Sequence, residues 1–211
     1  MQDSGAHIEF RPVGKVFHKH RNQLRPFCAR RFDYGTSEPL LQTLHPGRVK
    51  QMLLPPTETL FWTSAVFSAM FQWWVLAAVA GIILFTDVIR RHGSLTRRRI
   101  PIRLSGVLLA VIRSHLAFAY HCCSFVSRYY LIPVPLLLPF ATMLGAVMLG
   151  MHVTAGLVEY ALKNPHLNPI SFLFYFTLEQ VSYQAGVWWG CFKHLRFNPL
   201  VPRFVYARKL L

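Results

Sequence analysis

Long uncharged segments alternate with basic ones along this chain of 211 residues. The longest uncharged segment, 131–158, holds no Asp, Glu, Lys or Arg. As a helix it would reach roughly 42 Å, whereas the hydrocarbon core of a bilayer is about 30 Å thick. We therefore predict a membrane-spanning helix over 131–158. After a weakly charged loop at 159–168, a second spanning helix over 169–192 is predicted to return across the bilayer.

The apolar segment 59–86 carries no formal charge and has two interpretations. It is either one tilted span or a re-entrant pair of helices that bends near residues 72–74. The loop that follows, 88–103, is rich in arginine, and the first part of the chain is basic too. Basic loops of membrane proteins gather on the cytoplasmic side, so both segments belong there. This placement favours a re-entrant or shallow 59–86 over a single crossing.

Segment 104–127 has the pattern of an amphipathic helix. Its polar residues recur at spacings of seven, three and four, which places them on one helix face. A helix of this kind lies in the membrane interface more readily than it crosses the bilayer, so we expect an interfacial helix. The residues of the polar face are Ser114, His121, Ser124 and Arg128.

The two ends of the chain are polar and basic. Residues around Ile8 to Val16 alternate as in a short strand, and a short helix broken at Gly35 is expected after them. The predicted fold class is mainly α, with two membrane spans and additional re-entrant or interfacial helices. Three regions are expected: a basic cytoplasmic segment (1–57), a membrane domain (58–192) and a basic cytoplasmic tail (193–211).

The net charge of the chain limits the kinds of partner that it is expected to bind. Lys and Arg number 23 against 8 Asp and Glu, a formal net charge of +15. Nucleic-acid binding calls for a basic patch on a soluble domain of recognisable fold, which this sequence does not contain, so no nucleic-acid partner is expected. The charge indicates an integral membrane protein whose loops contact the bilayer and anionic lipid headgroups. A phosphate-bearing substrate is compatible with the same charge.

Glu179 is the most informative single residue. A carboxylate near the centre of a membrane helix costs about 3 kcal/mol and usually faces the interior of a bundle. Gln180, Tyr183 and Gln184 share its side of the predicted helix. This polar cluster either holds neighbouring helices together by hydrogen bonds or forms a wall for a lipid-linked substrate.

Histidines permit two more hypotheses. His152 could ligate a b-type haem with a second histidine, although a hydrogen-bonded membrane histidine is commoner. His18 and His20 would point the same way on a strand and could hold a metal ion or a phosphate. No nucleophilic triad, phosphate-binding glycine loop or catalytic pair of carboxylates is present, so the chain alone shows no complete active site.

A resemblance to a known family is carried by two stretches, VGKVFHKHRNQLRPFCARRFDYGTSEPLLQTLHP and the later EQVSYQAGVWWG. They resemble the end of the catalytic domain and the following membrane region of membrane-bound family-two glycosyltransferases. The nearest subgroup is the mycofactocin-type glycosyltransferases. The resemblance covers essentially the entire chain, and it implies that 1–57 is the end of a GT-A-like α/β catalytic domain.

The family holds its sugar nucleotide on a GT-A domain, with a divalent cation (Mg²⁺ or Mn²⁺) on a D-x-D-type motif and a further acidic residue as base. Neither motif has a counterpart here, so the resemblance implies the cation for the full enzyme only. His18 matches a position where some relatives place a metal ligand. Arginine binds phosphate oxygens bidentately, although headgroup contact is an equal alternative for the arginines. The residues expected to bind substrate phosphate are Arg30, Arg31, Tyr34, Thr36 and Ser37.

The resemblance predicts the membrane module of a glycosyltransferase that transfers a sugar from a nucleotide-sugar donor at the cytoplasmic membrane face. The acceptor is expected at the interface, with a lipid-linked molecule as one option. The GT-A catalytic core is expected to be supplied in cis or in trans. The alternative is a non-catalytic membrane-anchoring subunit of a larger complex. Both place the chain in the inner, cytoplasmic membrane.

Overall fold

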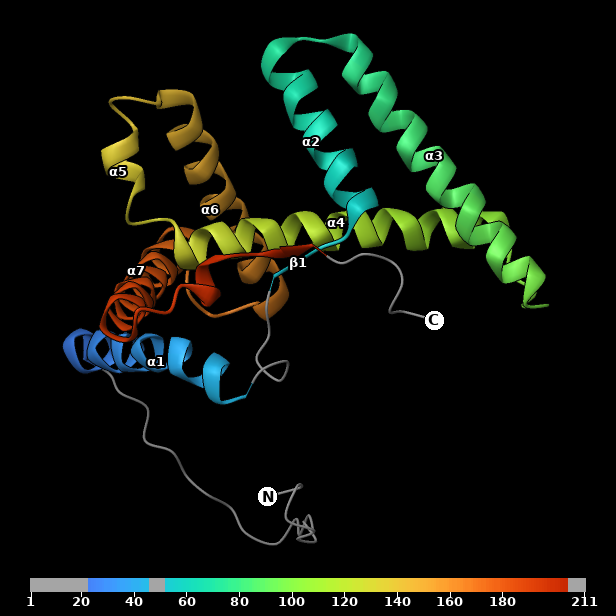
Figure 1. Cartoon of the computed structure of the whole chain (residues 1–211). Coiled ribbons are helices and arrows are strands. Elements are labelled where there is room, and N and C mark those ends of the chain that lie inside the picture. Colours follow the sequence, from blue (N-terminus) through green and yellow to red (C-terminus); the bar gives the residue numbers. More distant parts are fainter. Residues whose placement is uncertain (1–22, 46–51, 205–211) are drawn as a thin grey trace, which may run out of the picture.

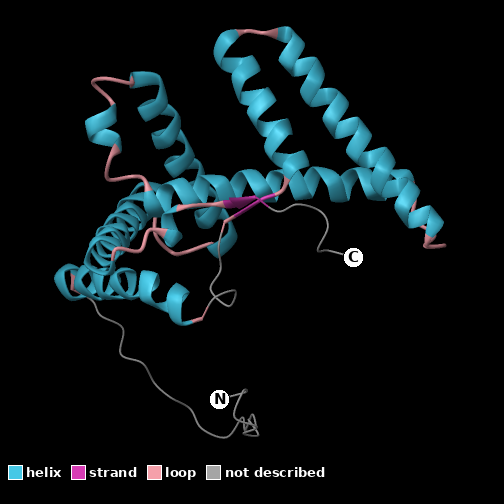
Figure 2. Cartoon of the chain, viewed as in Figure 1, coloured by secondary structure: helices cyan, strands magenta, loops and turns pink. Residues whose placement is uncertain are grey.

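The computed structural model describes residues 23–45 and 52–204, and within these ranges the chain is mainly helical (Figure 1, Figure 2). The predicted fold class, mainly α, is confirmed. The strand expected near Ile8 and the metal ligand His18 lie outside the described residues, and the three predicted regions stay predictions. The helices are α1 (Leu24–Leu44), α2 (Pro56–Phe71), α3 (Trp74–Arg97), α4 (Leu104–Tyr129), α5 (Val134–Leu137), α6 (Thr142–Lys163), α7 (Pro169–His194) and the 3₁₀ turn η2 (Asn198–Leu200).

The segment 59–86 is two helices joined by a tight turn, as the re-entrant interpretation required. Helix α2 ends at Phe71, and Gln72 adopts a left-handed conformation with φ of 54°. Helix α3 begins two residues later, at Trp74, and packs back along α2. The predicted bend near residues 72–74 is therefore confirmed.

The prediction of one helix over 131–158 is wrong. Only the short α5 forms in its first part, and the long helix α6 begins at Thr142. The cause is a run of prolines at 133, 135 and 139, which lack a backbone N–H and push the preceding residue out of the helical region. Helix α6 then continues beyond Val158 to Lys163.

Two helices in the described part of the chain are long and apolar enough to cross a membrane, α4 and α6. Only 22% of the most apolar stretch of each is buried, whereas the core helix of a soluble protein is mostly buried. Helix α6 overlaps the predicted first span. Helix α7 forms as predicted but is not among the two helices apolar enough to cross. Helix α4, which we expected only at the interface, is among them.

Helix α4 is the axis of the molecule. Figure 1 shows the α2–α3 hairpin and the α5–α6 hairpin rising from the same side of α4, while α1 lies on the other side. Packing of α2, α3, α6 and α7 against α4 holds this arrangement. A short parallel pair, β1 (Leu53–Leu54) with β2 (Arg203–Phe204), joins the tail to the start of α2.

Helix α1 runs unbroken through Gly35, so the predicted break there is wrong. A Cβ on Gly35 would overlap the carbonyl oxygen of Tyr183, and one on Gly186 would overlap that of Phe32. Gly190 meets the backbone of α1 one turn further along. The glycines therefore allow α1 and α7 to approach backbone to backbone, and Gly35 is needed for this contact rather than for a turn.

Candidate functional site

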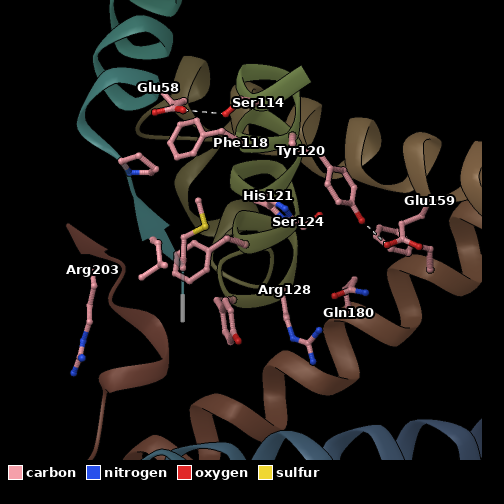
Figure 3. A pocket seen from close by; sticks show the side chains of 17 residues that line it. Glu58, Ser114, Phe118, Tyr120, His121, Ser124, Arg128, Glu159, Gln180 and Arg203 are labelled. Atoms are coloured by element: carbon pink, nitrogen blue, oxygen red, sulfur yellow. Dashed lines mark hydrogen bonds between the residues drawn. The ribbon is translucent and has the colours of Figure 1, made fainter. Parts of the chain in front are cut away.

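A groove of about 1140 Å³ opens along α4, between the starts of β1 and α2 on one side and α6 and α7 on the other (Figure 3). The four polar residues that the sequence places on one face of this helix all line it, so the predicted helix face is confirmed. Apolar side chains from β1, α4, α7 and the residues next to β1 form much of the rest of the wall. They are Met52, Leu53, Pro55, Ala117, Phe118, Phe125 and Phe176.

The carboxylates in the groove are already paired. Glu58 accepts hydrogen bonds from the Ser114 hydroxyl at 3.0 Å and from Arg91 at 2.9 Å. Glu159 accepts a hydrogen bond from the Tyr120 hydroxyl at 2.5 Å and pairs with Lys163 at 2.7 Å. Neither carboxylate therefore leaves an uncompensated negative charge in the groove.

In the part of the chain that the structure describes, two arginines in the groove have no carboxylate partner. Arg128 places its guanidinium 4.0 Å from the ring centre of Tyr183, and Arg203 projects from β2. Among the described residues, no carboxylate lies within 4.0 Å of either guanidinium. Figure 3 shows both arginines away from the Glu58 end of the groove. The free charge of the groove is therefore positive and lies toward one end.

Three buried residues beside the groove could hold a metal ion by distance alone. Glu58, Asp87 and His115 offer ligand atoms within 4.8 Å of one another. Arg91, however, donates to both carboxylate oxygens of Asp87 at 3.0 Å and to Glu58 at 2.9 Å. A divalent cation would have to displace this guanidinium. In this arrangement the three residues do not fit the divalent cation that the resemblance implies.

The Asp87–Arg91 contact changes the pKa of the carboxyl group. Burial of the Asp87 side chain raises its pKa, but hydrogen bonds from Arg91 and Arg90 outweigh burial and leave the pKa below its ordinary value of 3.8. The charged form of Asp87 is therefore the stable one at neutral pH. This network fastens the base of the α2–α3 hairpin to α4 through Ser114.

The predicted phosphate-binding residues lie on α1 and do not form one pocket. Arg31 pairs with Glu179 of α7 at 2.8 Å, and the Arg30 guanidinium stacks on Tyr34 at 4.8 Å. The Thr36 and Ser37 hydroxyls donate to carbonyls of their own helix. Arg30, Tyr34 and Ser37, spaced four and three apart, are exposed on one face of α1.

The predicted polar cluster on α7 is divided among several neighbours. Tyr183 donates to Glu38 of α1, and Tyr129 of α4 donates to the same carboxylate at 2.6 Å. The side-chain oxygen of Gln184 accepts the backbone N–H groups of 131 and 132 at 2.9 and 3.2 Å. Gln180 lines the groove. Most residues of the cluster thus make contacts between α7 and its neighbours, and a role in substrate binding stays a prediction.

His152 has two hydrogen-bonding partners. Its ring nitrogens lie 2.8 Å from the hydroxyls of Ser127 and Thr177. Both nitrogens are therefore engaged between α4, α6 and α7, which is the commoner of the two roles expected for this residue. The haem hypothesis gains no support from it.

Sequence reasoning missed the acidic residues that organise these contacts: Glu38, Glu58 and Asp87. Only Asp87 had a local signal, since Arg90 and Arg91 follow it at helical spacings of three and four. Glu58 meets Arg91 across 33 positions, and Glu38 meets Tyr183 across 145. No local pattern reports contacts of that separation.

Comparison with known proteins agrees with the resemblance in the sequence. Pre-mycofactocin glycosyltransferase of Mycobacterium tuberculosis, strains CDC 1551 / Oshkosh and ATCC 25618 / H37Rv, is 24% identical over 219 residues. The chain is homologous to part of that glycosyltransferase. The alignment covers 95% of the chain but 43% of the relative, so the chain spans less than half of the relative's length. No family model and no solved structure matches.

Proposed function

We propose that this chain is the membrane module of a family-two glycosyltransferase that transfers a sugar from a nucleotide-sugar donor at the cytoplasmic face of the inner membrane. The observation that carries the proposal is the homology to pre-mycofactocin glycosyltransferase over 95% of the chain. The length, apolar composition and low burial of α4 and α6 support a role in the membrane.

In this proposal α1 is the junction with a GT-A catalytic domain, which holds the donor and its divalent cation. The exposed face of Arg30, Tyr34 and Ser37 turns toward that domain. Arg31 and Thr36 lie nearer to α7, so they hold the junction in place. Glu38 ties α1 to two other helices, because Tyr129 of α4 and Tyr183 of α7 both donate hydrogen bonds to its carboxylate. The catalytic domain is thereby fixed to the helix that lines the groove.

The groove along α4 is proposed to hold the acceptor. Its apolar wall suits the hydrophobic part of a lipid-linked or otherwise amphiphilic molecule, and its unpaired arginines suit an anionic group of acceptor or donor. Gln180 and the polar face of α4 provide hydrogen bonds along the wall. Anionic lipid headgroups are expected at the exposed arginines around the α3–α4 loop.

A chimera tests the proposal. This chain would replace the matching part of the Mycobacterium tuberculosis relative, and release of nucleoside diphosphate from nucleotide-sugars would be measured in washed membranes. We expect the membranes to release nucleoside diphosphate, and the rate of release to fall at least tenfold in Arg128→Gln. Arg98→Gln, which changes a matched arginine outside the groove, should change this rate little.

Two outcomes would contradict the proposal. Transfer that persists unchanged when this chain is left out would remove any role for it. A chimera that stays in the membrane without transfer, while the intact relative is active, would favour the alternative of a non-catalytic anchoring subunit.

A further inference from the structure

We propose that both helical hairpins enter the bilayer from the side on which α1 lies and return to it, and that α7 does not cross. The partner of this surface is the lipid bilayer itself. The inference concerns membrane topology and holds or fails independently of sugar transfer.

The first support is the position of charge. No Asp, Glu, Lys or Arg occurs in 59–86 or in 131–158. The charged residues nearest to the first hairpin stand at its base: Glu58 at the start of α2, and Asp87 with two arginines on α3. The second hairpin likewise meets its first charge, Glu159, where α6 reaches Tyr120 of α4. Both hairpins are therefore free of charge from tip to base.

The second support is the exposure of the tips. Trp73 and Trp74 are 61% and 82% exposed, and Leu136 and Phe140 are 74% and 92% exposed. Soluble proteins seldom gather large apolar side chains at this exposure in a contiguous patch. Figure 1 shows both tips on the same side of α4. One lipid phase can cover both tips at once.

The third support is length. From Thr59 to Phe71, α2 rises roughly 20 Å, and from Thr142 to Val158, α6 rises roughly 25 Å. The hydrocarbon core is about 30 Å thick. The uncharged arms therefore place the tips inside the hydrocarbon core, beyond its middle, and carry no charged loop to the far headgroups.

Helix α7 belongs on the aqueous side by its contacts. It packs along α1, whose exposed residues include Arg25, Arg30 and Asp33. The Arg31–Glu179 pair between the two helices is 36% and 33% exposed, which requires solvent rather than hydrocarbon around it. Exposed arginines at the end of α3 and before α4 follow the base of the first hairpin along the chain and suit lipid phosphates. They are Arg97, Arg98, Arg99 and Arg103.

Cysteine labelling tests the topology. In a parent with its four native cysteines replaced by alanine, single cysteines would be introduced as His166→Cys before α7, Arg196→Cys after it, Arg98→Cys at the hairpin base and Trp74→Cys at the tip. A membrane-impermeant maleimide would be added to sealed vesicles of each orientation. We expect the first three cysteines to be labelled from the same face only, and Trp74→Cys from neither face until detergent is added.

Opposite-face labelling of His166→Cys and Arg196→Cys would show that α7 crosses, and would overturn the inference. A second measurement keeps the native cysteines: quenching of tryptophan fluorescence by brominated lipids. We expect Trp73→Phe/Trp74→Phe to lose most of the quenching by deep bromines, and Trp189→Phe on α7 to keep it. Equal loss in both would also contradict the inference.

Discussion

The close approach of α1 and α7 predicts a large effect from a single methyl group. A Cβ added at Gly186 would overlap the carbonyl oxygen of Phe32 and lie 2.8 Å from its carbonyl carbon. Both obstacles are backbone atoms, so no side-chain rotation relieves the overlap. Ordinary contact needs about 3.5 Å, so the new Cβ and the Phe32 carbonyl oxygen must move apart by about 1.5 Å.

Separation of the helices weakens every contact between them, including the Arg31–Glu179 pair and the hydrogen bonds to Glu38. Overpacking of this kind costs about 2 kcal/mol. For a chain of this size that corresponds to a fall in Tm of roughly 4–8 °C. The measurement is thermal unfolding of purified Gly186→Ala in lipid nanodiscs, followed by circular dichroism.

Gly150→Ala is the matched control, because a Cβ at Gly150 in α6 meets nothing within 4 Å. Alanine is the better helix former by about 1 kcal/mol, so this variant should unfold at a slightly higher temperature than the native chain. Equal shifts in Tm for the two variants, or no shift for Gly186→Ala, would refute the close packing of α1 on α7.

Three further perturbations address the contacts at the groove and the hairpin base. Arg91→Ala leaves the carboxylates of Asp87 and Glu58 without their shared partner and should destabilise the chain by about 2 kcal/mol. The cost is less than for a fully buried pair, because the Arg91 side chain is 40% exposed. As the control, Arg98→Ala should change Tm little in the same assay. The pKa of Asp87 is lowered in the folded chain, so its stabilising effect is full above the ordinary value of 3.8 and is lost as the pH falls through the lowered value. The difference in Tm between the native chain and Asp87→Asn should accordingly be constant above that pH and shrink below it, and a constant difference throughout would contradict the charged state. Gln184→Leu removes the acceptor of two backbone N–H groups and should cost about 2 kcal/mol by thermal unfolding, whereas a neutral result would mean that water replaces the amide.

Local sequence patterns predicted the helices whose boundaries are set locally. The bend near Gln72 follows from the basic segments on both sides of the apolar run, which belong on the same face of the membrane. The polar face of α4 follows from spacings of seven, three and four. The same reasoning failed at 131–158, because absence of charge was given more weight than three prolines, and proline acts on the backbone whether or not lipid surrounds it.

The candidate site was less accessible to sequence reasoning than the fold. The polar face of α4 was identified, but the groove depends on β2 and α6 coming to lie beside that face. The Glu58–Arg91 and Glu38–Tyr183 contacts join distant positions, so only the folded chain reveals them. Gly35 illustrates the same limit. Its lack of a side chain was taken as a sign of a helix break, whereas the backbone of Tyr183 in α7, 148 positions further along the chain, leaves no room for one.

The most direct test of the central claim, that lipid covers the two hairpins, is flotation of the expressed chain after extraction of membranes with alkaline carbonate. We expect the chain to float with the lipid after extraction and to enter solution only with detergent. Recovery of a monodisperse chain in the aqueous fraction without detergent would contradict the claim.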